Sequence, residues 1–126
     1  MMRRAPSLRA ITAACHRWQR RLRLEDWTIK VEVRRLADMG QGTLASIDPH
    51  SVKRQARVRL LDPRDVDGQR FWFDGEAWNW ELSLVHELLH LHWWDTHRRR
   101  WPGDGTPEGV AIESAIDAIA KALVNG

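Results

Sequence analysis

The sequence predicts an α+β domain with an N-terminal helix, a small, mostly antiparallel sheet, and two C-terminal helices. Apolar residues recur every three or four positions near both ends of the chain, which is the period of a helix. Between them, three short segments alternate apolar and polar residues, which is the period of a strand. With 126 residues, the chain is expected to form one domain over residues 1–126 around a single modest core.

The first helix is predicted between Ser7 and Leu24. Its apolar positions are three or four residues apart and form one stripe, and Pro6 and Ser7 suit a helix start. Arginines between the stripe residues are expected to face water. The single cysteine excludes an intramolecular disulfide, and its place in the stripe indicates a core residue. The stripe consists of Leu8, Ile11, Cys15, Trp18 and Leu22.

Three strands are expected next. Residues 27–34 alternate most regularly, with Trp27, Ile29, Val31 and Val33 on one face. Residues 43–47 form a second, shorter strand that Asp48-Pro49 is expected to end. Residues 55–60 form the third. Because the connections are too short for helical crossovers, the pairing is expected to be mostly antiparallel.

The two C-terminal helices have recognisable starts. Residues 62–78 allow either a short extra strand or an apolar loop at Phe71–Phe73. The next helix begins between Glu76 and Trp80, with Asp74 or Asn79 as the N-cap, and runs to about Trp94. Thr106, Pro107 and Glu108 then start a last helix. Its broad apolar face holds Val110, Ile112, Ala115, Ile116, Ile119, Ala120 and Leu123.

A His-Glu-x-x-His motif, His86-Glu87-Leu88-Leu89-His90, lies inside the first of these two helices. Residues four apart share a helix face, so His86 and His90 can present imidazole nitrogens to one metal ion. Zn²⁺ held by three protein ligands lowers the pKa of bound water to roughly 7, and an adjacent carboxylate can then take its proton. The pattern predicts two zinc ligands and Glu87 as general base. Satisfied core histidines are the alternative.

The third ligand is expected on the last helix. Glu113 and Asp117 lie four residues apart, hence on one face, among apolar neighbours. Acids on a narrow polar face are the alternative interpretation. The neighbours favour ligation, because burial of unpartnered carboxylates is costly.

These motifs resemble those of the gluzincin metallopeptidases, in which a His-Glu-x-x-His helix precedes a helix with Glu-x-x-x-Asp. The matching residues here are residues 86–90 and 113–117, and the order of elements is similar to that of the single-domain minigluzincins. The resemblance implies a minimal zincin-like fold with His86, His90 and Glu113 as zinc ligands. It further implies Glu87 as general base and Asp117 as the acceptor that orients His86.

Other zinc-peptidase patterns fit less well. Metzincins place Gly and His three and six residues after the second histidine, where this chain has Trp93 and Thr96, so His97 is out of register by one. His92 turns to another side of the helix. Gluzincins often stabilise the oxyanion with Tyr or His, but the chain has no Tyr. His50, His97 or an arginine among residues 98–100 would have to serve.

The functional expectation is a zinc-dependent metallopeptidase that acts on peptide or protein substrates. No signal peptide or transmembrane span is recognisable, so a cytoplasmic protein without membrane association is predicted, as a monomer. The net charge is +3, and arginines cluster at residues 3–23, 53–64 and 98–100. A solvated surface explains such clusters, but nucleic acid remains a possible partner. The alternative function is a zinc-containing regulatory or DNA-associated protein that binds or cleaves one partner, such as a repressor.

Overall fold

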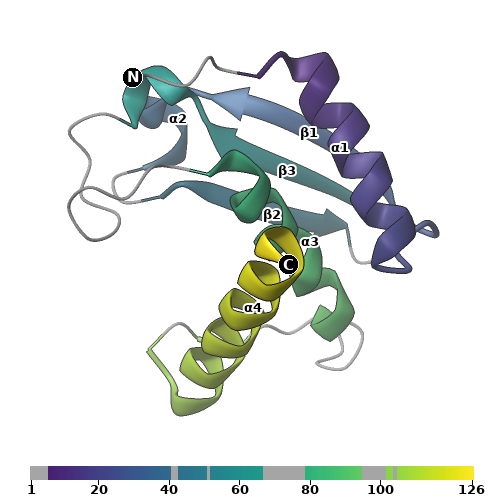
Figure 1. The fold of residues 1–126 in the computed structure, drawn as a ribbon. Helices are drawn as coiled ribbons and strands as arrows, with labels where there is room; N and C mark the ends of the chain where they lie inside the picture. Colours follow the sequence, from purple (N-terminus) through teal and green to yellow (C-terminus); the bar gives the residue numbers. More distant parts are fainter. Residues whose placement is uncertain (1–5, 41–42, 51, 67–78, 95–101, 104) are drawn as a thin grey trace.

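The computed structural model describes residues 6–40, 43–50, 52–66, 79–94, 102–103 and 105–126. Within them, four α-helices, one 3₁₀ helix and a three-stranded sheet confirm the predicted α+β class (Figure 1). Residues 67–78, including Phe71–Phe73, lie outside the described part of the chain, as do residues 95–101. The elements are α1 (Leu8–Arg21), β1 (Thr28–Arg34), α2 (Leu36–Met39), β2 (Ala45–His50), β3 (Gln55–Leu61), η1 (Pro63–Asp65), α3 (Trp80–Trp94) and α4 (Pro107–Asn125).

Helix α1 begins where the sequence indicates. The hydroxyl of Ser7 accepts a hydrogen bond from the backbone N–H of Ala10, which satisfies one of the free donors of the first turn. The predicted stripe packs toward β1, with Ile11, Cys15 and Trp18 buried. Burial raises the pKa of the Cys15 thiol to about 12, so Cys15 is a protonated core residue, as predicted.

The sheet has the order β1-β3-β2 and is mixed, which corrects the prediction of a mostly antiparallel sheet. β2 pairs antiparallel with β3, whereas β1 pairs parallel with β3, in a register that places Val31 beside Val58. The chain reverses direction after β1 and again after β2. β3 therefore runs in the same direction as β1. No helical crossover is needed, because β1 pairs with the edge of β3 that β2 leaves free.

Strand β2 continues through Asp48-Pro49, which the sequence analysis expected to end it. Pro49 lies opposite Ala56 of β3. β2 is an edge strand, where a residue without a backbone N–H is tolerated because one side of the strand has no partner.

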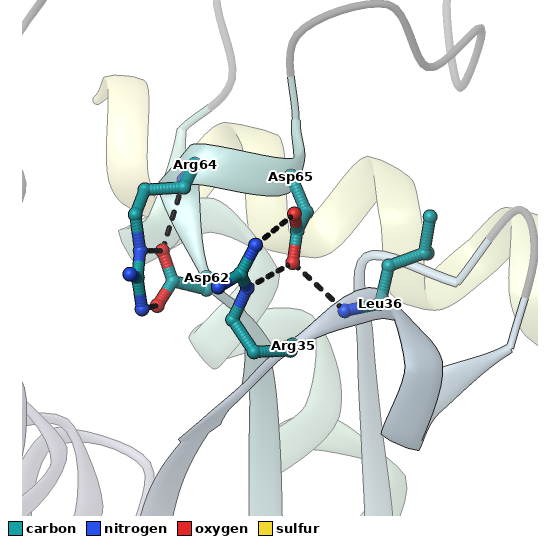
Figure 2. Close-up of polar contacts among 5 residues, drawn as sticks. All are labelled: Arg35, Leu36, Asp62, Arg64 and Asp65. Carbon is teal, nitrogen blue, oxygen red and sulfur yellow. Dashed lines mark hydrogen bonds and ion pairs between the residues drawn. The ribbon is translucent and has the colours of Figure 1, made fainter.

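Two short helices, α2 and η1, were not predicted, and one ion pair joins them (Figure 2). The guanidinium of Arg35 donates to both carboxylate oxygens of Asp65, at 2.7 and 2.9 Å. The backbone N–H of Leu36 donates to the same carboxylate at 2.9 Å. These hydrogen bonds, the one from Arg35 first, lower the pKa of Asp65 to about 2. The contact fixes the chain at one end of the sheet.

The larger helices α1, α3 and α4 all lie on one side of the sheet (Figure 1). α3 contacts α1, β2 and β3, and α4 packs chiefly on α3. The indole N–H of Trp18 donates to Glu81 at 2.9 Å and ties α1 to the start of α3. No helix in the described part of the chain is long and apolar enough to cross a membrane.

The apolar face of α4 is narrower than predicted. Ile112, Ile116 and Ala120 are buried, whereas Val110, Ile119 and Leu123 are exposed. A helix that packs mainly on one other helix buries a single line of side chains, three or four residues apart. The sequence therefore predicted a wider buried face on α4 than the described part of the chain shows.

Candidate metal centre

Helix α3 positions the two histidines of the motif. Its first turn is capped by Asn79, whose side-chain oxygen accepts from the backbone N–H groups of Glu81 and Leu82 at 3.1 and 3.2 Å. This settles the choice between Asp74 and Asn79 in favour of Asn79. Successive turns then place His86 above His90, with ring centroids 5.2 Å apart. Buried neighbours hold this part of α3 against the sheet and α1: Leu84, Val85, Leu88, Leu89 and Leu91.

The motif residues gather their ligand atoms in one place. His86, Glu87 and His90 each offer one ligand atom, and these three atoms lie within 4.8 Å of one another. Among the described residues, these three form the group that could hold a metal ion. Glu87 is only 8% exposed. Burial disfavours the charged form of this carboxylate, and a bound cation would offset that cost.

Glu113 of α4 contacts both histidines of this group. Its Oε2 lies 3.0 Å from Nε2 of His86, and its Oε1 lies 3.0 Å from Nε2 of His90. Zinc bonds of about 2.0–2.1 Å in a tetrahedron hold neighbouring ligand atoms about 3.4 Å apart, so the observed distances differ by only a few tenths of an ångström. Both nitrogens point at one carboxylate. His86, Glu87 and His90 could hold a metal ion, and Glu113 lies within 3.0 Å of both imidazoles through its two oxygens.

The side chains of this site differ in their exposure to solvent. The side chain of Glu113 is 43% exposed, whereas the imidazole of His90 is largely buried.

Asp117 faces the other nitrogen of the His86 ring. Its Oδ1 lies 3.7 Å from Nδ1 of His86, which is too long for a hydrogen bond. Its Oδ2 pairs with Lys121, one turn further along α4, at 3.0 Å. The predicted orienting contact is therefore approached but not made. Sequence analysis missed Lys121, although the four-residue spacing from Asp117 was a usable signal.

Burial shapes the electrostatics of the site. It raises the pKa of Glu87 to about 8, and the negative charge of Glu113 adds to this effect. The pKa of His90 is lowered to about 4, chiefly by burial. The negative charge of Glu113 raises this pKa and the neighbouring His86 lowers it, but the effect of burial is the largest. His90 is therefore neutral at pH 7, the form in which imidazole binds metals. The pKa of Glu87, about 8, is close to neutral pH, which suits a general base.

The other histidines of the described residues do not join this site. His92 and His16 are exposed on α3 and α1. The Nδ1 atom of His50 accepts hydrogen bonds from the backbone N–H groups of Val52 and Lys53, both at 3.3 Å, so its ring is engaged in the connection between β2 and β3. The other candidates for oxyanion stabilisation, His97 and residues 98–100, lie outside the described residues.

Comparisons of the chain with protein-family models, with curated proteins and with solved structures find no match. The resemblance to gluzincins therefore rests on the two motifs alone. The proposed function therefore depends on the geometry of residues 86–90 and 113–117.

Proposed function

We propose that the chain is a zinc-dependent metallopeptidase of the gluzincin type. The observation that carries the proposal is that His86, Glu87 and His90 bring their ligand atoms together and that Glu113 contacts both imidazoles at 3.0 Å. Two imidazoles and one carboxylate form a donor set used by catalytic zinc sites. The same set also suits ferrous iron, but a buried carboxylate next to the first histidine favours hydrolysis, because it supplies a base.

Each residue has a distinct role in the proposed reaction. Zinc, when bound, acts as a Lewis acid that polarises a carbonyl group and acidifies water. Glu87 takes the proton of the water that attacks the scissile carbonyl, and then passes it to the leaving amine. His90 binds without first losing a proton, because its pKa lies near 4. Asp117 faces the Nδ1 side of His86 at 3.7 Å, and it would orient the ring once this distance closes to a hydrogen bond.

The decisive experiment combines metal analysis with peptide hydrolysis. Protein purified without added metal is expected to contain one zinc per chain and to cleave members of a fluorogenic peptide library. Glu87→Gln should keep the zinc and lose hydrolysis by about 10²- to 10⁴-fold, because the amide has nearly the same shape but cannot accept a proton.

A matched control is Glu25→Gln, at an exposed position between α1 and β1. This variant carries the same chemical change outside the site and should retain full activity. Iron in place of zinc, or hydrolysis by Glu87→Gln at the wild-type rate, would contradict the proposal. Loss of zinc from Glu87→Gln would instead identify Glu87 as a ligand.

A further inference from the structure

The face of the sheet turned away from α1 and α3 presents a cluster of charged side chains. Side chains alternate along a strand, so the buried Ile29, Val31 and Val58 face the helices. Their neighbours in sequence face the other way. The register places Lys30 of β1 beside Arg57 of β3, and Glu32 beside Arg59. Arg34, two residues after Glu32, lies on the same face.

One carboxylate is shared by four cations in this cluster. Glu32 oxygens lie 3.1 Å from Arg34, 3.6 Å from Arg57, 3.7 Å from Arg59 and 3.8 Å from Lys30. We call these five residues the Glu32 cluster; its net charge is +3. Asp48 of β2 stands opposite Arg57 and reduces the local charge by one. A positive surface therefore remains after every carboxylate of these strand positions is counted.

The cluster does little for the fold. Glu32 is 12% exposed, but Lys30, Arg34 and Arg57 are exposed to solvent. Exposed ion pairs contribute about 0–1 kcal/mol each, and the cations repel one another across the strands. An excess of cations on a flat sheet is thus a cost to stability, which an external anion would remove. The cluster is therefore a candidate binding surface.

We propose that the Glu32 cluster binds the phosphate backbone of a nucleic-acid duplex, without reading its sequence. Three of the four cations are arginines, whose planar guanidinium groups bind phosphate oxygens in pairs. This proposal does not depend on the metal centre, since α3 packs on the opposite face of the sheet.

The other side chains of this face narrow the choice of partner. Thr28, Ser46, Asp48, His50 and Gln55 surround the cluster, with Leu44 and the buried Leu61 at the Arg34 end of the face, and none of these described neighbours is Phe, Tyr or Trp. Stacking of single-stranded bases needs aromatic side chains. A protein interface needs an apolar centre, and charged residues are depleted there. Contact with the duplex backbone needs neither, because it depends on cations.

The test measures the salt dependence of binding to a fluorescently labelled 20-base-pair duplex of arbitrary sequence. Three to four phosphate contacts predict a slope of roughly −3 in a plot of log affinity against log salt. Arg57→Gln combined with Arg59→Gln should weaken binding about tenfold and make the slope shallower by about 2. Glu32→Gln should tighten binding, because it removes the one central negative charge. A purely structural role for Glu32 predicts weaker binding instead.

Arg9→Gln combined with Arg20→Gln is the matched control. Both arginines are exposed on α1, so the charge change is the same but lies on the other side of the sheet. This variant should bind nearly as the wild type does. Equal losses in both double variants would show diffuse charge attraction and overturn the proposal. Cluster-dependent binding to phosphatidylserine vesicles, with none to the duplex, would also overturn it and identify an anionic membrane as the partner.

Discussion

The Nε2 atom of His86 lies 3.0 Å from Oε2 of Glu113, a residue 27 positions further along the chain. This contact joins α3 to α4, and α4 packs mainly on α3. A metal ion between these atoms would therefore crosslink the last helix to the rest of the fold. Metal affinity and the stability of α4 are expected to rise and fall together.

The first prediction concerns the relative weight of the ligands. Glu113→Ala should weaken zinc binding more than Asp117→Ala, because it removes a direct ligand and leaves two imidazoles on one helix. Loss of Asp117 should cost at most about 10- to 100-fold in affinity, since it only frees the orientation of His86. Competition with a chromophoric chelator measures these affinities.

Two histidines serve as comparisons in this titration. His92→Ala should change zinc affinity least, because His92 is exposed on another side of α3. His97 is the competitor for the third ligand position, since a loop after His90 could fold back. A larger loss for His97→Ala than for Glu113→Ala would favour a three-histidine site over the proposed one.

The second prediction concerns the pH dependence of stability in the metal-free protein. Glu87 has its pKa raised from 4.5 to about 8, so the native state binds more protons than the unfolded state between these values. This contribution to stability decreases as pH rises. His90 has its pKa lowered from 6.5 to about 4, so its contribution increases with pH over that range. The two effects oppose each other up to about pH 6.5, and only the Glu87 effect acts above it.

Metal-free protein is therefore expected to lose about 2 kcal/mol of stability between pH 6.5 and pH 8. Urea denaturation at a series of pH values measures this loss. Glu87→Gln should remove it, since the amide stays neutral throughout. A wild-type protein whose stability rises over this interval would show that Glu87 is ionised in the native state.

Local periodicity was sufficient to predict most of the regular elements. α1, β1, β3 and α4 match the predicted segments to within a few residues, because each has an alternating or 3.6-residue pattern, and α1 and α4 also have recognisable caps. α2 and η1 were missed. They are only a few residues long and depend on the contact between Arg35 and Asp65, 30 residues apart, which no local pattern reveals.

For the sheet and the site as well, the sequence predicted local arrangements but not contacts between distant segments. The parallel pairing of β1 with β3 depends on which side of β3 the first strand adds to, and the sequence does not encode this locally. His86, Glu87 and His90 are close because they share one helix, so their spacing predicts their proximity. The approach of Glu113 depends on packing between two helices. Its role was predicted from a family resemblance, and it remains a prediction.

The third prediction concerns the glycine where α4 begins. A Cβ atom at Gly109 would lie 2.2 Å from the carbonyl oxygen of Gly103, which the hydroxyl of Thr106 holds through a 2.7 Å hydrogen bond. Gly109→Ala should destabilise the protein by about 1–3 kcal/mol, because α4 must shift to relieve the overlap. The shift should also lower zinc affinity, since Glu113 lies one turn further along. Gly105→Ala is the control, as a Cβ there meets nothing within 4 Å. Urea denaturation and zinc titration of both variants provide the test, and a Gly109→Ala variant with wild-type stability and affinity would show that the start of α4 does not position Glu113.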